Sequence, residues 1–218
     1  MSKKIAVILA GSGVYDGSEI YESVITLLAL DQQDAHVQCF APNIPQLHVV
    51  NHLTGEVAEG ETRQVLVEAA RLARGQIKDI VDANVDDFDA VIIPGGFGVA
   101  KNLSDFALVG AEMSINPQVL SLVQSFKAAA KPVGLICIAP TLSAAIFGEG
   151  VQCTIGQDAD TAAAIEAMGG KHVPTQVEEI VVDEANKLVT TSAYMMAGRI
   201  RDAAVGINKL VDKVLAMA

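Results

Sequence analysis

The sequence predicts an α/β protein in which helices cover both faces of a mostly parallel β-sheet. Short aliphatic runs alternate along the chain with segments of helical periodicity, which is the pattern of strands joined by crossover helices. These runs are apolar at nearly every position, as expected of strands that are buried on both faces. The length of 218 residues is enough for one domain with a substantial core.

The strands and helices of the first two thirds follow one another in regular order. Strands are predicted at residues 4–11, 35–42, 88–96 and 131–139. Helices are predicted at residues 18–30, 60–74 and 117–130. Asp16 and Glu19 have the spacing of a helix-capping pair before the first of these helices, and Pro117 opens the third.

The last third continues the α/β pattern and adds a hairpin. Helices are predicted at residues 160–170 and 203–217. Between them, residues 179–193 hold two apolar runs around the polar turn "DEAN", which is typical of a β-hairpin. The sequence shows no linker, repeat or low-complexity tract, so residues 1–218 are predicted to form a single domain.

Composition excludes several classes of function. Hydrophobic residues make up 51% and charged residues 19%, as in a globular protein, and the net charge of −11 disfavours binding to nucleic acid or to anionic lipid. The apolar run "IAVILA" is too short to span a membrane. The cysteines at 39, 137 and 153 form no CxxC pair. We therefore expect a cytoplasmic protein without a membrane segment, a metal or another cofactor.

Polar and glycine residues gather where the predicted strands end. "GSGVYDGSE" follows the first strand, "PGGFGVAKN" the third, and Cys137 ends the fourth. Ligands of parallel sheets bind at the carboxyl ends of strands, near a switch in strand order. We therefore expect these three segments to line one pocket.

Cys137 stands at a sharp turn between the strand "PVGLIC" and a helix that begins near "APTLSAAI". Such an elbow lifts a side chain clear of the sheet, and a helix N-terminus directed at a thiol lowers its pKa. These features favour a nucleophile. A buried structural thiol is the alternative, because cysteine is among the most buried residue types.

Backbone and carboxylate groups near Cys137 complete a candidate site. The N–H groups of Gly95, Gly96 and Ile138 are candidates for an oxyanion hole, with an ordinary turn as the alternative. Glu19 is the candidate general base and Glu22 the alternate, although a Glu in a first helical turn commonly acts as a cap.

Other polar and aromatic residues are candidates for the wall of the pocket. Each has a structural alternative, such as forming a turn, capping a segment, or lying in a solvated loop. The candidates are Tyr15, Asp16, His52, Asn102 and Tyr194.

The motifs together resemble a known superfamily. "VIIPGGFGVAKNLSDFA" and "GLICIAPTLSAAI" are similar to segments of PfpI-like peptidases, deglycases and class I glutamine amidotransferases. "GVYDGSEIYES", "VVNHLTGE" and "TIGQDADTA" extend the resemblance along the chain. They match bacterial amidotransferase-like proteins that are associated with isoprenoid biosynthesis, named for enhancing lycopene formation and described as glyoxalases.

The resemblance implies a flavodoxin-like three-layer sandwich that forms a homodimer. It also implies conversion of methylglyoxal or glyoxal to a hydroxy acid without metal or glutathione. Cys137 matches the elbow cysteine, Glu19 is the best match to the acidic residue, and Gly95, Gly96 and Ile138 match the oxyanion hole. The small partner would be an α-oxoaldehyde.

One departure from the superfamily pattern bears on the reaction. Relatives often carry a His near the nucleophile, but Ile138 follows Cys137 here and "TIGQD" occupies the later position. This disfavours glutaminase or peptidase chemistry, with His52 the best remaining histidine for such a role. The second hypothesis, ahead of glutaminase or peptidase chemistry, is a non-enzymatic or weakly enzymatic stress or redox-sensing protein with an oxidisable cysteine.

Overall fold

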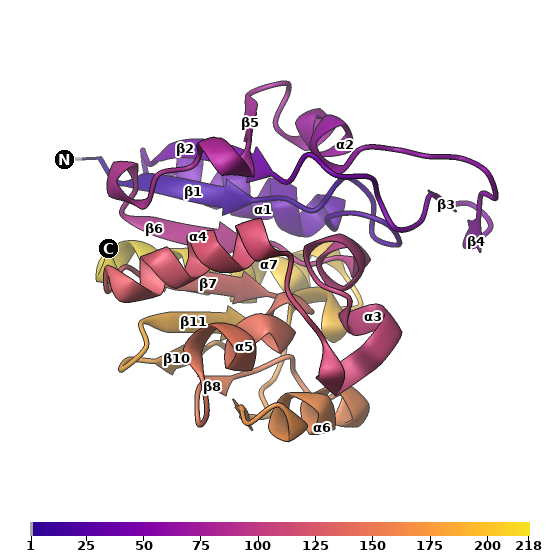
Figure 1. Cartoon of the computed structure of the whole chain (residues 1–218). Coiled ribbons are helices and arrows are strands. Elements are labelled where there is room, and N and C mark those ends of the chain that lie inside the picture. The colour runs from indigo at the N-terminus through magenta and orange to yellow at the C-terminus, as the bar shows by residue number, and fades with distance from the viewer. Residues whose placement is uncertain (1) are drawn as a thin grey trace.

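A seven-stranded sheet forms the centre of the molecule. The computed structural model describes residues 2–218, and its main sheet has the strand order β10-β11-β7-β6-β1-β2-β5 (Figure 1). Its strands are β1 (Lys4–Ile8), β2 (His36–Ala41), β5 (Ile77–Asp79), β6 (Ala90–Ile93), β7 (Val133–Ile136), β10 (Val181–Asp183) and β11 (Leu188–Thr191). Neighbouring strands are parallel except in the β10–β11 hairpin, which the sequence predicted.

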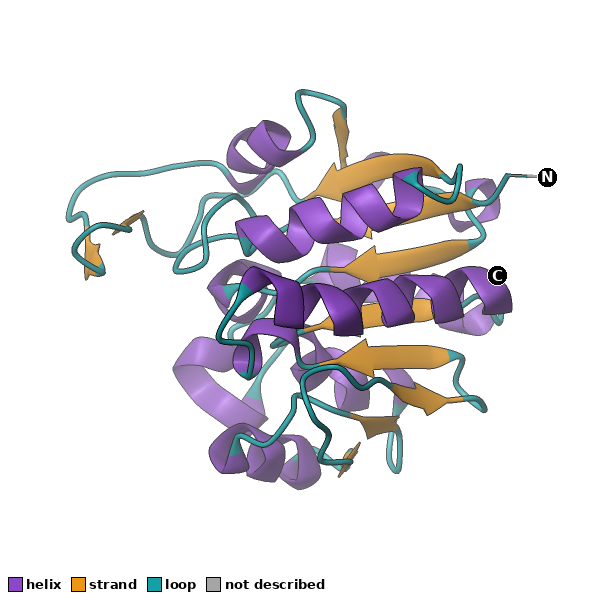
Figure 2. Ribbon diagram, turned by 180° about the vertical axis from the view of Figure 1, so that it is seen from behind, coloured by secondary structure: helices purple, strands orange, loops and turns teal. Residues whose placement is uncertain are grey.

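Helices cover both faces of this sheet, so the predicted fold class is confirmed. One face carries α1 (Ile20–Asp31), α2 (Val65–Leu72) and α7 (Ile200–Met217), and Figure 2 shows α1 and α7 lying across the strands. The other face carries α4 (Pro117–Ala128) and α5 (Ser143–Phe147). Two further helices, α3 (Phe106–Val109) and α6 (Ala159–Ala167), lie near the carboxyl ends of the strands (Figure 1).

Alternate residues of β1 supply the two cores. Ile5 and Val7 are fully buried in the core under α1 and α7, while Ala6 and Ile8 are fully buried in the core under α4 and α5. Burying a Val, Leu or Ile side chain is worth about 1.5–3 kcal/mol, so a strand apolar on both faces is held from both sides. This is why the sequence pattern identified the central strands.

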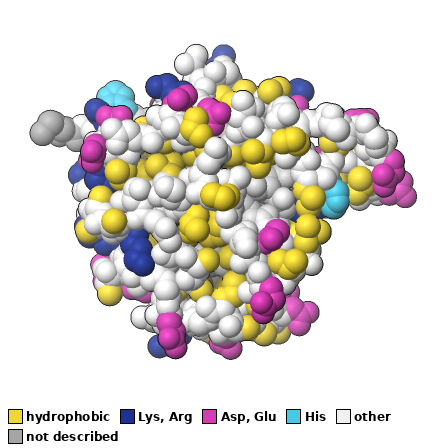
Figure 3. Space-filling view, viewed as in Figure 1, with side chains coloured by type: hydrophobic (Ala, Val, Ile, Leu, Met, Phe, Trp, Pro, Cys, Tyr) yellow, Lys and Arg dark blue, Asp and Glu magenta, His cyan; other side chains and the backbone are white. Residues whose placement is uncertain are grey.

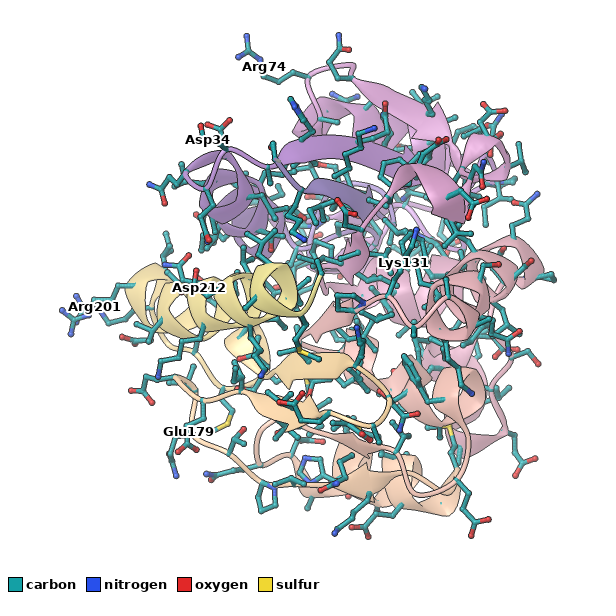
Figure 4. All side chains as sticks on the ribbon, turned by 90° about the vertical axis from the view of Figure 1, so that its left-hand side faces the viewer. Asp34, Arg74, Lys131, Glu179, Arg201 and Asp212 are labelled. Atoms are coloured by element: carbon teal, nitrogen blue, oxygen red, sulfur yellow. The ribbon has the colours of Figure 1, made fainter. Side chains whose placement is uncertain are left out.

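Charged side chains lie mainly on the outer surface. Figure 4 shows Asp34, Arg74 and Arg201 projecting away from the body of the molecule. Asp212 of α7 accepts a hydrogen bond of 2.6 Å from the side chain of Gln33, just beyond α1, and so helps to join these two helices. The two cores beneath these surface groups are built mainly from aliphatic side chains.

The segment between β2 and α2 differs from the sequence prediction. It projects from the body and carries a small hairpin of β3 (Val50–Asn51) and β4 (Glu56–Val57) (Figure 1). The predicted helix at 60–74 begins only at Val65, because residues 63–65 run beside 44–46 in extended conformation. Strand β5 and the small β8 (Gln152–Cys153) and β9 (Lys171–His172) pair were also not predicted.

The predicted capping pair of Asp16 and Glu19 is wrong for Asp16, which does not cap α1. Glu19 is the N-cap of α1, and its carboxylate accepts a hydrogen bond of 2.7 Å from the N–H of Glu22. Asp16 instead accepts a hydrogen bond of 2.7 Å from the N–H of Val50, in the projecting segment. The sequence did not show that a distant strand would offer Asp16 this donor.

Candidate active site

The loops after β1 and β6 meet at the switch in strand order. From β1 the chain continues to β2 on one side, and β6 lies on the other side. The N–H of Glu19 donates to the carbonyl of Gly95 at 2.9 Å, and the N–H of Phe97 donates to the carbonyl of Val14 at 2.8 Å. These bonds place the start of α1 against the "PGGFG" loop, as the sequence predicted.

Cys137 follows β7 at the same end of the sheet, in a strained elbow. Its φ is +65°, which a residue with a side chain rarely adopts, and its N–H donates to the carbonyl of Thr191 at 2.9 Å. A residue held in this region costs about 1–3 kcal/mol, a strain that is common at active sites. The elbow turns the thiol toward the loop at Gly95.

Glu22 is the carboxylic acid that contacts the thiol. Its side chain is fully buried, and its carboxyl group and the Cys137 sulfur both lie against Gly95. The N–H of Gly95 donates to one carboxyl oxygen at 2.9 Å and the N–H of Tyr194 donates to the other at 3.1 Å. Burial, assisted by the charge of Glu19, raises the pKa of Glu22 to about 8 against these hydrogen bonds.

The thiol itself is not activated by a helix, contrary to the prediction. Burial and the negative charge of Glu22 raise the pKa of Cys137 well above its ordinary value, although the N–H groups of Gly96 and Ile138 oppose this shift. The chain after Cys137 makes a 3₁₀ turn at Ala139–Leu142 before the five-residue α5. A long helix dipole is therefore not available to offset burial, and the thiol keeps its proton at neutral pH.

Glu19, the expected base, faces elsewhere. It is buried and caps α1, and burial raises its pKa while the N–H groups of Glu22, Tyr21 and Ile20 lower it. Side chains of a helix lean toward its N-terminus, so the residue one turn inside α1 reaches back to the thiol while the capping residue does not. The structure thus places the alternate residue, Glu22, at the sulfur.

The glycines of the "PGGFG" loop allow this close packing. A Cβ at Gly95 would lie 2.7 Å from a Glu22 carboxyl oxygen and 2.9 Å from the sulfur of Cys137, so no side chain fits there. Gly96 has a φ of +97° and packs directly against the backbone at Glu19. Both positions need glycine for geometric reasons.

Two of the three predicted oxyanion donors lie beside the sulfur. The N–H groups of Gly96 and Ile138 act on the Cys137 thiol and lower its pKa, against the larger effect of burial. The N–H of Gly95 is engaged by the Glu22 carboxyl and fixes the acid instead. An oxygen that develops beside the sulfur would therefore be met by two backbone donors.

The thiol opens into a pocket of about 420 Å³. Its lining residues come from six parts of the chain and are Val14, Gly96, Phe97, Ala100, Phe106, Ala107, Cys137, Ile138, Asp158, Thr161, Tyr194 and Met195. Two hollows are substantially larger. One of about 560 Å³, between the start of α4 and residues 80–85, has no ionisable side chain in its lining, and one of about 650 Å³, between α1 and the end of α2, has Asp31 and Arg74 but no thiol or hydroxyl nucleophile. The pocket at Cys137 is therefore the candidate active site.

Of the predicted pocket residues, only Tyr194 lines this pocket. Asn102 donates hydrogen bonds of 2.9 Å to the carbonyls of Ala10 and Asp16, and the N–H of Tyr15 donates to a ring nitrogen of His52 at 3.2 Å. Together with the bond from Val50 to Asp16, these contacts hold the first loop against the projecting segment. Their role in the structure is to join two parts of the backbone.

Most of the pocket wall was not predicted from the sequence. The apolar Phe97 and Phe106 lie inside quoted motifs, and the polar Asp158 and Thr161 lie within "TIGQDADTA". Nothing in an apolar residue type distinguishes a pocket wall from a core, so no local signal identified them.

Among residues 2–218, no cluster of three or more His, Cys, Asp or Glu side chains has the arrangement of a metal site, and none of the pocket-lining residues is a histidine.

The geometry defines a class of protein: a parallel α/β sandwich with an elbow cysteine, a buried carboxylic acid partner and two backbone donors at one pocket. Residues 3–199 match the DJ-1/PfpI family, and the chain belongs to that family. The family includes enzymes of the glyoxalase and deglycase types as well as stress-response proteins.

Relatives extend over nearly the whole chain. The human glutamine amidotransferase-like class 1 domain-containing protein 3, mitochondrial, is 45% identical over 97% of this chain and 82% of its own length. The crystal structure of an isoprenoid biosynthesis protein with an amidotransferase-like domain from Ehrlichia chaffeensis has a TM-score of 0.92 and 39% identity and covers 99% of both chains. Drosophila melanogaster DJ-1beta, with a TM-score of 0.56 and 20% identity, shares the fold.

The comparisons contradict the cytoplasmic location expected from the sequence. The human protein, a rat ES1 protein homolog that is 43% identical and a zebrafish ES1 protein that is 33% identical are all named mitochondrial. The expectation rested on the short apolar run "IAVILA" and on unpaired cysteines, which indicate a reducing compartment but do not distinguish one reducing compartment from another. Within residues 2–218, no helix combines the length and apolar character needed to cross a membrane.

Proposed function

We propose that this protein converts α-oxoaldehydes such as methylglyoxal or glyoxal to 2-hydroxy acids, with Cys137 as nucleophile and Glu22 as general base. The observation that carries the proposal is the buried pair of the Cys137 thiol, which lines one pocket, and the Glu22 carboxylic acid behind it, whose pKa is about 8. A general base works best when its pKa lies near the operating pH.

The first step adds the thiol to the aldehyde. The ionised Glu22 takes the proton from sulfur as sulfur bonds to the aldehyde carbon, so the high pKa of the thiol is met by a base within hydrogen-bonding contact. The N–H groups of Gly96 and Ile138 stabilise the oxygen as negative charge develops, and the proton then passes to that oxygen to give a hemithioacetal.

The second step is an internal oxidation and reduction. Glu22 removes the hydrogen on the former aldehyde carbon, giving an enediol, and returns a proton to the adjacent carbon. The former aldehyde carbon becomes a thioester carbonyl and the former ketone becomes an alcohol, so no external oxidant or reductant is consumed. Water cleaves the thioester, releases the hydroxy acid and restores the thiol.

The arrangement gives less support to the two other hypotheses. A thiol whose pKa is raised by burial is a poor target for peroxide, because the thiolate is the reactive form. Glutaminase or peptidase chemistry relies on a His beside the cysteine, and no histidine is among the residues that line the pocket.

We also propose that the protein forms a homodimer, which is common in the family.

The test measures methylglyoxal consumption and lactate formation without glutathione, in wild type and in Cys137→Ala, Glu22→Gln and Glu19→Gln. We expect turnover by wild type, loss of at least about 100-fold in kcat for the first two variants, and a much smaller loss for Glu19→Gln. Folding is checked by thermal unfolding. Turnover by Cys137→Ala at the wild-type rate would refute the nucleophile, and a larger loss for Glu19→Gln than for Glu22→Gln would reassign the base.

A further inference from the structure

The pocket at Cys137 is much larger than the smallest substrates of the proposed reaction require. Its volume of about 420 Å³ lies in the range of about 300–1,000 Å³ that is typical of sites for drug-sized ligands. A two- or three-carbon oxoaldehyde has only a few non-hydrogen atoms and would leave most of this space to water. The unused volume points to a substrate with a larger substituent.

The walls of this space are mainly apolar and aromatic. The rings of Phe97, Phe106 and Tyr194 line it together with Val14 and Met195. Phe106 is half-buried and comes from the short α3, and apolar side chains gather at the surface over that helix (Figure 3). Aromatic rings and a thioether contact planar or branched apolar groups favourably.

The charges at the pocket disfavour an anionic substrate. Apart from Cys137 and Tyr194, Asp158 is the only ionisable residue in the lining, and hydrogen bonds from Thr161 lower the pKa of Asp158. The nearby Lys101 ammonium is not in the lining and donates to the carbonyl of Tyr15 at 2.9 Å. The lining itself holds no cation, although the Lys101 ammonium lies 5.4 Å from the centre of the Phe97 ring, so a phosphate or carboxylate placed near Asp158 would meet repulsion.

We propose that the substrate is an uncharged α-oxoaldehyde with an aromatic or branched alkyl substituent, and that Phe106 is the specificity-determining residue that contacts this substituent. The inference rests on the proposed function. The aldehyde carbon would lie at the Cys137 sulfur, with the Glu22 carboxyl behind it, and the substituent would extend along the wall formed by Phe106 and Met195. Asp158 excludes acidic analogues.

The first measurement compares kcat/KM for phenylglyoxal, methylglyoxal and 4-carboxyphenylglyoxal. We expect wild type to prefer phenylglyoxal to each of the others by at least about tenfold, which is the discrimination a hydrophobic pocket gives to a modest apolar group. Phe106→Ala should lower the phenylglyoxal-to-methylglyoxal ratio about tenfold. Asp158→Asn, which keeps a capping oxygen for α6, should raise the relative activity on 4-carboxyphenylglyoxal.

Leu108→Ala is the matched control, because Leu108 lies on the same short helix, is 61% exposed and does not line the pocket. It should leave all three kcat/KM values within about twofold of wild type. Equal kcat/KM for phenylglyoxal and methylglyoxal, with an unchanged ratio in Phe106→Ala, would overturn the inference while the proposed reaction stands.

A second measurement does not depend on turnover. The rate at which phenacyl bromide alkylates Cys137 is compared with that of iodoacetamide, each divided by its rate with free cysteine and assigned to the residue by mass spectrometry. We expect a preference for the aromatic reagent of at least about tenfold that Phe106→Ala removes and Leu108→Ala keeps. This preference without oxoaldehyde turnover would refute the proposed reaction and support the pocket's selectivity. Its absence would overturn the selectivity.

Discussion

Two buried carboxylic acids of the β1–α1 region, Glu22 and Asp16, lie in very different surroundings. Both accept backbone N–H hydrogen bonds, and both are less than 5% exposed. Glu22 also contacts the Cys137 thiol beside a pocket. Asp16 instead lies 3.8 Å from a ring nitrogen of His52, whose side chain is 38% exposed. A buried acid next to a nucleophile and a cavity is a candidate for catalysis, whereas the same group between two backbone segments holds them together.

The largest loss of activity should come from filling the space between Glu22 and Cys137. Gly95→Ala would place a methyl group within contact of both side chains, so we expect it to lower kcat/KM for the preferred oxoaldehyde by at least about 100-fold, the cost of displacing reacting groups by about 1 Å. Gly198→Ala, where nothing lies within 4 Å, is the control. Steady-state kinetics decide the question, and a fully active Gly95→Ala protein would contradict this geometry.

The pH dependence of activity sharpens the role of Glu22. Because the base must be ionised and the pKa of Glu22 is about 8, kcat/KM should rise about tenfold per pH unit below pH 8 and level off above it. A pH–rate profile between pH 5.5 and 9.5 tests this with buffers of constant ionic strength. A flat profile between pH 6 and pH 8 would show that another group sets the protonation state.

The same acid should affect stability with the opposite sign to an ordinary surface carboxylate. Its pKa rises from 4.5 in the unfolded chain to about 8 in the folded protein, so the stabilisation is complete below pH 4.5 and is lost as pH rises to 8. Relative to Glu22→Gln, the free energy of unfolding of wild type should fall by at most about 1.4 kcal/mol per pH unit in that window. Urea unfolding at pH 5, 6, 7 and 8 measures it, and a difference that does not change with pH would argue against a raised pKa.

The smallest effects on activity and stability should come from changing His52, which lies beside Asp16. His52→Ala removes a half-exposed ring that is outside the pocket, so we expect kcat/KM within about twofold of wild type and a loss of about 1 kcal/mol or less in unfolding free energy. Asp16→Ala would leave the N–H of Val50 without its acceptor and should cost about 1–3 kcal/mol. A large loss of activity in His52→Ala would give this histidine a role in the reaction.

Much of the fold was predictable because its signals are local. Strand β1 reads as an uninterrupted apolar run, and the turn "DEAN" between β10 and β11 marks its own hairpin. The projecting segment at residues 42–64 was not predicted, because its hairpin strands are only two residues long and its contacts are with distant backbone. Strand β5 is likewise short and lies at the edge of the sheet.

Some features of the candidate site were also predictable from the sequence, and others were not. The elbow position of Cys137 and the paired glycines follow from the order of residue types, and both lie at the end of the sheet where they were expected. The choice of Glu22 over Glu19 depends on the direction in which α1 side chains lean, and the state of the thiol depends on burial that no local pattern reports. The pocket wall at Phe106 joins a segment far from Cys137 in the chain.

The sequence by itself determined the α/β class, the family and the meeting of three loops at one end of a parallel sheet, because hydrophobic periodicity and turn residues act over a few positions. Only the tertiary structure decided which acid lies beside the thiol, that burial raises the pKa of both groups, and that the pocket beside them is lined mainly by apolar side chains. Desolvation and cavity shape arise from residues brought together across the whole fold, and for that reason they are properties of the folded chain.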